Sequence, residues 1–202
     1  GAVVAMLTQD ALPQDRHWLR ELVAPFAVEG VAGAIGRHRA YPDRNGLVAR
    51  DLGLMFDRFR DLGPLFSFQD GLPGFLRPGS LEWRMAMHFY SDNNSAMRRA
   101  VWEKIPYPEI DWGEDQVWCW EMQKLGMKKA YADRAVVWHS HNLNESAQIK
   151  VSSDEAKMFA QYFGYDLVGG VFSEANFEET KAEAFLYATN VGIPINHAET
   201  YA

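Results

Sequence analysis

Acidic residues and histidines stand at the ends of apolar segments in two parts of the sequence. Glu114 and Asp115 open the stretch GEDQVWCWEMQKLGMKKAYADRAVVWHSH, and His139 and His141 close it. Asp10 follows the apolar run VVAML in the same way. A carboxylate and an imidazole that meet in one pocket can bind a divalent cation such as Mn²⁺ or Mg²⁺, and imidazole suits Mn²⁺ better. A second carboxylate held off the metal could act as a general base, a role worth roughly 10²–10⁴-fold in rate.

This set of groups suits transfer from a diphosphate-activated donor to a hydroxyl, because a metal can neutralise the leaving group. Each group also has a structural alternative. Asp10 could cap a helix that Pro13 opens, and acids in the first turn of a helix are stabilised by its dipole, which favours their ionised form. One of the two histidines could be structural or exposed, with His139 the favoured ligand.

The elements that would position these groups alternate between strands and helices. The run VVAML predicts a buried strand, DRHWLRELVAPFA a helix with one apolar face, and VAGAIGR a second buried strand. Further on, NGLVARDLGLMFDRFRDLG has helical periodicity, whereas SFQDGLPGFLRPGS is rich in Gly and Pro and predicts a loop. This order indicates an α/β protein.

The second half of the sequence continues the pattern. SAMRRAVWEKI predicts a helix that Asn93, Asn94 and Ser95 could cap, and the helix that starts at Glu114 ends at Gly126. MKKAYADRAVVW predicts a short strand, a turn and a stronger strand. Two amphipathic helices follow, in SSDEAKMFAQYF and EANFEETKAEAFLYATN, joined by the apolar segment YDLVGGVF.

Composition excludes several classes of protein. The 202 residues carry a formal net charge of -7, which argues against a basic groove for nucleic acid. Cys119 is the only cysteine, so no intrachain disulfide can form, and we expect a buried structural thiol in a reducing, cytoplasmic compartment. No apolar run of about 18 residues predicts a transmembrane segment. Peripheral binding at the inner face of the membrane stays compatible with the sequence.

Other candidates come from residue type alone. Asp92, Asn93 and Asn94 could line a sugar or acceptor pocket, although capping explains them nearly as well. Trp112 is a candidate platform for a sugar ring, whereas Trp118 and Trp120 have the helical spacing of core residues. Arg98 and Arg99 could contact a diphosphate, but a solvated helix face is the simpler interpretation.

Four segments, taken in order, resemble the second half of a family 2 glycosyltransferase, most of all the bacterial rhamnosyltransferases. They are TQDALPQDRHWL, VAGAIGRHRAYPD, YSDNNSAMRRAVWEKI and GEDQVWCWEMQKLGMKKAYADRAVVWHSHN. The resemblance implies part of the GT-A fold, a Rossmann-like mixed sheet flanked by helices. Residues 1–145 would be the catalytic and acceptor half, starting at the strand of the Asp-x-Asp motif, and residues 146–202 a C-terminal helical extension.

The resemblance also implies roles for particular residues. Asp10 matches the metal-binding acid of the Asp-x-Asp motif, in which Thr8 replaces the first Asp and Gln9 stands between them. The family's Glu-Asp pair falls on Glu114 and Asp115, with Asp115 in the position of the catalytic base. The late metal-binding histidine of the family falls on His139, with His141 as the near alternative.

The implied activity is transfer of a sugar, with L-rhamnose as a candidate, to a saccharide or glycolipid acceptor with inversion. The donor would be a dTDP- or UDP-linked sugar, and the cofactor Mn²⁺ or Mg²⁺. The resemblance starts only at the Asp-x-Asp strand, so we expect a missing N-terminal half or a second chain to complete the nucleotide site. Two other classes stay open: a metal-dependent hydrolase with the same groups, and a non-catalytic relative that binds carbohydrate or a partner.

Overall fold

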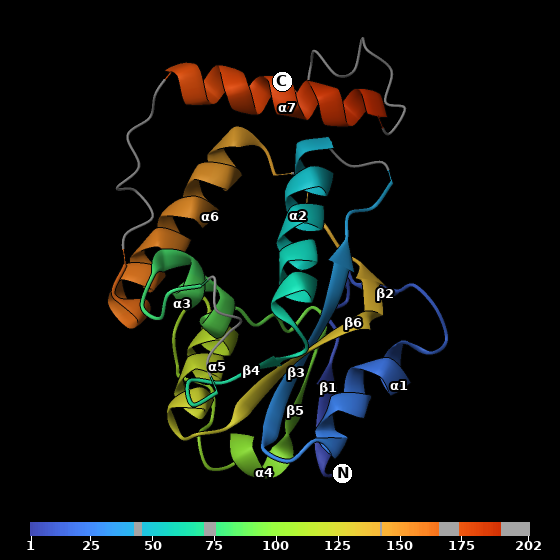
Figure 1. Cartoon of the computed structure of the whole chain (residues 1–202), viewed down its shortest axis with the longest axis vertical. Helices are drawn as coiled ribbons and strands as arrows, with labels where there is room; N and C mark the ends of the chain where they lie inside the picture. The colour runs from blue at the N-terminus through green and yellow to red at the C-terminus, as the bar shows by residue number, and fades with distance from the viewer. Residues whose placement is uncertain (43–45, 71–75, 142, 166–173, 191–202) are drawn as a thin grey trace.

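A six-stranded mixed sheet with helices on both faces forms the centre of the chain (Figure 1). The computed structural model describes residues 1–42, 46–70, 76–141, 143–165 and 174–190. The strands are β1 (Val3–Met6), β2 (Leu12–Pro13), β3 (Val31–Arg39), β4 (Leu65–Phe66), β5 (Ser95–Arg98) and β6 (Lys128–Trp138). Their order is β1-β5-β3-β6-β2, and β4 also pairs with β6. The predicted α/β fold with a mixed sheet is confirmed.

The two longest strands, β3 and β6, run parallel at the centre of the sheet. Nearly every residue of β3 is buried, as its apolar, glycine-rich sequence predicts. The segment predicted as two strands and a turn forms the single strand β6, with a register shift opposite Gly36 and Arg37. Antiparallel pairing joins β5 to β3 and β1 to β5. Because β5 alone pairs with β1 among the described residues, β1 is a half-exposed edge strand and the prediction of a buried strand was wrong.

One face of the sheet is covered by α1 (Trp18–Val23) and the 3₁₀ turn η1 (Ala24–Ala27). Leu22 and Phe26 pack there against small residues of β3, β5 and β6. The predicted helix start at Pro13 was wrong. Pro13 belongs to β2 and pairs with Val137 of β6, and the helix begins only at Trp18. Asp10 therefore lies in a turn between two strands and caps no helix.

The other face carries the larger core, formed by α2 (Gly46–Leu62), α3 (Leu81–His88) and α5 (Glu114–Lys124). Trp118 and Cys119 are buried in it, and burial raises the pKa of the Cys119 thiol to about 12, so the expected inert core cysteine is confirmed. The buried ammonium of Lys129 donates to the carbonyls of Ala86, Met87 and Phe89. These bonds fix the end of α3, from which the chain continues to Asp92.

The segment predicted as a capped helix begins as a strand and becomes helical only afterwards. Residues Ser95–Arg98 form β5, and only the single turn α4 (Arg99–Trp102) is helical. Tertiary pairing on both edges of β5 overrides the helical periodicity of this segment. Arg98 donates to the carbonyls of Val31 and Phe26 and so has a structural role.

Two C-terminal helices pack outside this core (Figure 1). Helix α6 (Glu145–Met158) continues into the π-helical turn η2 (Phe159–Phe163), and Met158, Phe159 and Phe163 pack against Val117 of α5. Helix α7 (Glu174–Asn190) contacts α2. Parts of the predicted loop (71–75), of the linker (166–173) and of the extension (191–202) lie outside the described residues. Of the helices that the structure describes, none has the length and apolar character needed to cross a bilayer.

Candidate active site

The predicted site residues meet at one edge of the sheet, although they come from distant parts of the sequence. The chain leaves β1 towards Thr8 and Asp10, enters β5 from Asp92 and Asn93, and leaves β6 towards His139. Because β5 is antiparallel to β1, its start lies beside the end of β1. The N-terminus of α5 brings Glu114 and Asp115 to the same edge, where a pocket of about 560 Å³ opens.

Asp10, His139 and His141 form a cluster that we call the metal-ligand cluster. Their nearest ligand atoms all lie within 4.8 Å of one another. Asp10 Oδ2 is 3.4 Å from His139 Nε2 and 3.7 Å from His141 Nε2. His139 is buried, whereas the side chain of His141 is 55% exposed. Burial lowers the pKa of His139, which favours the neutral imidazole that a metal requires.

The cluster passes a test for metal binding that rests on His139. Its Nε2 atom is buried and has no hydrogen-bond partner in the described part of the chain. A buried nitrogen without a partner is costly, and a cation would satisfy it. Asn93 lies against the other ring nitrogen, with its amide 3.4 Å from Nδ1, and Thr8 donates a hydrogen bond of 2.9 Å to Asn93. A residue at this position orients a metal-ligating imidazole when it accepts the Nδ1 proton, which requires the Asn93 amide to turn its oxygen towards Nδ1.

Asp92 and Asp115 form a second group, the carboxylate pair. The backbone N–H of Asp92 donates to Asp115 Oδ2 at 3.1 Å, and that of Gln116 donates to Oδ1 at 2.7 Å. Burial and the charge of Asp92 raise the pKa of Asp115 to about 7. Ser95 and Tyr107 both donate their hydroxyls to Asp92 Oδ1. The helix dipole was expected to keep Asp115 ionised, but burial is the stronger effect.

Gly113 explains how the carboxylate of Asp115 comes to be held beside α6. It precedes α5 with φ of +79°, a conformation that favours glycine, and a Cβ there would lie 2.5 Å from Met158 Cε. Met158 can therefore pack directly against the start of α5. A side chain at residue 113 would be strained at this φ and would require the Met158 side chain to move.

The other predicted residues differ in their placement. Glu114 and Trp112 line the pocket, and Trp112 packs edge-on against Phe159 at 6.5 Å. Gln9 is exposed in the turn before β2 and is not part of the pocket lining. Trp118 is core as expected, and Trp120 packs against Phe68 and other aromatic rings.

Asn94 is separated from the pocket, although its neighbours Asp92 and Asn93 line it. Its buried amide donates to the carbonyls of Arg37 and Ala135 and accepts a bond from Trp18 Nε1. A Cβ at Gly36 would collide with this amide and with the Ala135 carbonyl, so the close approach requires glycine. Asn94 therefore joins β3 to β6 where their register shifts, and it has no free group for a substrate.

Three further residues line the pocket and were not predicted from the sequence. His38, near the end of β3, lies 5.4 Å from the His139 ring, and burial lowers its pKa to about 3. Gln116 directly follows Asp115, but only Asp115 was predicted as a site residue. Glu155 lies in α6, whose amphipathic pattern gave no sign of a site. The signal that could have found Gln116 is its position one residue after the predicted base.

Comparisons with known proteins show what the chain resembles in sequence and in fold. No family model matches the chain. The O-antigen chain rhamnosyltransferase RfbN of Salmonella typhimurium is 28% identical over 142 residues, which make up 69% of this chain and 41% of RfbN. The mannosyltransferase PcManGT from Pyrobaculum calidifontis, solved in complex with GDP-Man and Mn²⁺, matches with a TM-score of 0.53 and 15% identity.

The structural match covers 100% of this chain and 49% of PcManGT. The chain thus spans less than half the length of either protein. Its sequence is similar to a rhamnosyltransferase, and its fold is similar to part of a glycosyltransferase, so the resemblance to glycosyltransferases is confirmed.

Proposed function

We propose that this chain is the catalytic and acceptor part of an inverting, metal-dependent glycosyltransferase. It would transfer a sugar, with L-rhamnose as the first candidate, from a nucleotide-diphosphate donor to a saccharide hydroxyl. One observation carries the proposal: His139 and His141, which hold Asp10 between them, line the same pocket as Asp115, a carboxylate with a pKa of about 7. The similarity to RfbN supports the candidate sugar.

Asp115 would take the proton from the attacking acceptor hydroxyl. A general base works best when its pKa lies near the working pH, and the raised pKa of Asp115 meets this condition. Its two backbone hydrogen bonds fix the carboxylate within the wall of the pocket. Glu114, next to it on the same pocket wall, would position the acceptor, and Trp112 would offer an apolar platform for a sugar ring.

Asp10 and His139 would hold a divalent cation, with His141 as a further or alternative ligand. When bound, Mn²⁺ or Mg²⁺ would stabilise the negative charge that develops on the diphosphate leaving group. Mn²⁺ is favoured because two of the three candidate ligands are imidazoles, and PcManGT was solved with this ion. Asn93 and Thr8 would hold the His139 ring in place.

The nucleotide part of the donor would need more protein than the chain described here. PcManGT is about twice as long as this chain. We therefore propose that an N-terminal half or a second chain completes the nucleotide site. A cytoplasmic location fits the lone reduced cysteine.

Calorimetric titration with dTDP, UDP and GDP, each with and without Mn²⁺, tests the proposal. We expect Mn²⁺-dependent binding of at least one nucleotide, with loss of that binding in Asp10→Ala. Asp61→Ala, which removes an exposed carboxylate far from the pocket lining, is the control and should bind as wild type does. Nucleotide binding that is equal with and without Mn²⁺, or that survives in Asp10→Ala, would contradict a metal-dependent transferase.

A further inference from the structure

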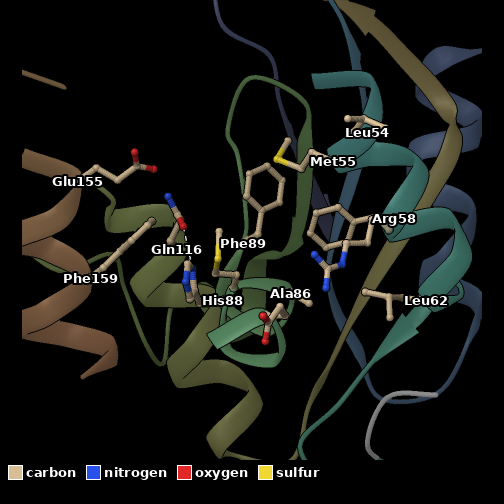
Figure 2. Close-up of a pocket in the computed structure, with 13 residues that line it drawn as sticks. Leu54, Met55, Arg58, Leu62, Ala86, His88, Phe89, Gln116, Glu155 and Phe159 are labelled. Carbon is tan, nitrogen blue, oxygen red and sulfur yellow. Dashed lines mark hydrogen bonds between the residues drawn. The ribbon is translucent and has the colours of Figure 1, made fainter. Parts of the chain in front are cut away.

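A second pocket opens beside the candidate active site, between α2, α3, α5 and α6 (Figure 2). Its volume is about 440 Å³, within the range of small-ligand sites. Most of its wall is apolar, formed by Leu54, Met55, Phe59, Met85, Phe89 and Phe159. Arg58 and Glu82, of opposite charge, stand exposed at its rim, so no net charge there would attract an ionic ligand.

This apolar pocket is continuous with the candidate active site. Met55, Phe89, Gln116 and Glu155 line both pockets. Gln116 directly follows Asp115, the proposed base. A ligand whose hydroxyl reaches Asp115 could therefore extend past Gln116 and Glu155 into the apolar pocket.

Two polar side chains at this junction have unused hydrogen-bonding groups. Glu155 is partly buried, yet its carboxylate has no hydrogen bond or ion pair with any described residue. Burial alone raises its pKa. Gln116 uses Oε1 to accept a bond of 2.8 Å from His88, and its Nε2 has no partner among the described residues. In Figure 2 the amide nitrogen of Gln116 points towards the side of the pocket where Glu155 lies.

His88 fixes the orientation of the Gln116 amide. Burial lowers the pKa of His88 to about 3, so its ring is neutral and has one N–H. With the Tyr165 hydroxyl donating to Nε2, that proton lies on Nδ1 and is donated to Gln116 Oε1. The Gln116 amide group then presents a donor to the junction, and Glu155 presents an acceptor. A donor and an acceptor side by side suit the hydroxyl groups of a sugar.

We infer that the apolar pocket and the Glu155–Gln116 junction bind an amphipathic acceptor, a saccharide that carries an apolar group. The inference rests on the proposed function. The sugar would bind Gln116 and Glu155 with its reacting hydroxyl at Asp115, and the apolar group would fill the pocket beyond. A purely polar saccharide fits this pocket poorly, because its hydroxyls would lose water against an apolar wall without gaining hydrogen bonds.

The direct test compares acceptors with and without an apolar group. Methyl and n-hexyl glycosides of glucose, galactose, mannose, rhamnose and N-acetylglucosamine are titrated into the full chain by ligand-observed NMR. For at least one sugar we expect the hexyl glycoside to bind at least about tenfold more tightly, since each buried methylene adds affinity. Equal affinities, or no binding of any hexyl glycoside, would overturn the inference.

Two pairs of variants separate the apolar pocket from the sugar contact. Leu54→Glu places a charge on the pocket wall at a side chain that is 60% exposed, so folding should tolerate it. It should remove the advantage of the hexyl group and leave the affinity for methyl glycosides unchanged. Leu125→Glu makes the same change at a residue that is 61% exposed and outside the pocket, and should change neither. If Leu54→Glu and Leu125→Glu had equal effects on the binding of hexyl glycosides, the assignment of the apolar pocket to the apolar group would be overturned.

Glu155→Gln should weaken the binding of methyl and hexyl glycosides by the same factor, about tenfold. Glu178→Gln, at an exposed position of α7, should not change their binding. Unchanged affinity in Glu155→Gln would overturn the sugar contact. These results are independent of the nucleotide titration. Hexyl preference together with nucleotide binding that ignores Mn²⁺ would keep the acceptor site and refute the metal-dependent transferase. Mn²⁺-dependent nucleotide binding without hexyl preference would refute only this inference.

Discussion

The metal-ligand cluster and the carboxylate pair lie at the same edge of the sheet but hold their acids in different environments. The side chain of Asp10 is 46% exposed, and the Thr8 hydroxyl, the backbone and the two histidines lower its pKa. Asp115 lies deeper, and burial together with the charge of Asp92 raises its pKa to about 7. At neutral pH the first acid is permanently charged and the second can gain and lose a proton.

This difference assigns chemistry to each end of the pocket. A permanent anion beside the buried imidazole of His139 can bind a cation but is too weakly basic to accept a proton from a hydroxyl. A carboxylate with a raised pKa can accept that proton. Two carboxyl groups whose environments shift their pKa values in opposite directions are the pattern of an active site with divided roles. The following predictions test whether that division is real, from the largest expected effect to the smallest.

Asp115→Asn should have the largest effect on catalysis. It removes the proposed base, so we expect transfer activity to fall by roughly 10²–10⁴-fold, with Mn²⁺-dependent nucleotide binding retained. Activity is measured by release of nucleoside diphosphate with the acceptor present. A variant that kept more than a tenth of the activity would rule out Asp115 as the base.

The same substitution should stabilise the protein at pH 8. The folded state raises the pKa of Asp115 above its ordinary value of 3.8, so it binds this proton more tightly than the unfolded chain does. The contribution to the free energy of unfolding is therefore greatest below about pH 4 and is lost as the pH rises to about 7. Asn carries no charge, so we expect a gain of ~1–3 kcal/mol at pH 8 in urea unfolding. Asp61→Asn, at an exposed side chain, should give no gain.

Substitutions in the metal-ligand cluster should weaken Mn²⁺ binding, which Asp115→Asn should not do. Asp10→Ala and His139→Ala should each weaken Mn²⁺ binding by about 100-fold, because each removes a ligand. His141→Ala should cost less than tenfold, since its exposed side chain is held least firmly. Calorimetry with Mn²⁺ alone gives the affinities. If His141→Ala cost as much as His139→Ala, the ligand assignment within the cluster would be reversed.

Two neighbouring asparagines offer a sharper comparison. Asn93→Ala should reduce Mn²⁺ affinity by about tenfold, because it removes the residue that orients His139, with little change in stability. Asn94→Ala should leave Mn²⁺ affinity unchanged but cost ~2–4 kcal/mol of unfolding free energy, because it leaves Trp18 Nε1 and two buried carbonyls without their partner. Similar results for both variants would contradict their separate roles.

The sequence predicted the acids and histidines of the site because each follows or precedes a strongly patterned element. Asp10 comes after β1, His139 after β6 and Asp115 at the start of α5, so local pattern was enough to place them at element ends. That these ends meet depends on the antiparallel pairing of β1 with β5, which no local pattern encodes.

The errors arose where tertiary contacts decide the outcome. SAMRRAVWEKI has apolar residues at helical spacing, but two strand partners make its first four residues β5. Asn94 looked like a cap or a sugar contact until the close approach at Gly36 placed its amide between strands. Glu155 could not be found from sequence, because its role depends on how α6 packs against the start of α5 through Met158.

Asp92→Asn should give the smallest and most specific effect, a shift in the pH dependence of activity. The charge of Asp92 is the second cause, after burial, of the raised pKa of Asp115. Asn keeps Oδ1 for the hydroxyls of Ser95 and Tyr107, so the local structure should persist. Without the neighbouring charge, the pKa of Asp115 falls and more of it is ionised in mild acid.

The acid limb of kcat/KM should therefore move by about half to one pH unit towards lower pH, which raises the relative rate at pH 5.5 by roughly three- to tenfold. The profile of wild type and variant, measured from pH 5 to 9, checks this. An unmoved acid limb would mean that burial alone tunes Asp115 and that Asp92 serves only to hold Tyr107 and Ser95. The division of roles between the two ends of the pocket would then rest on depth within the fold rather than on paired charges.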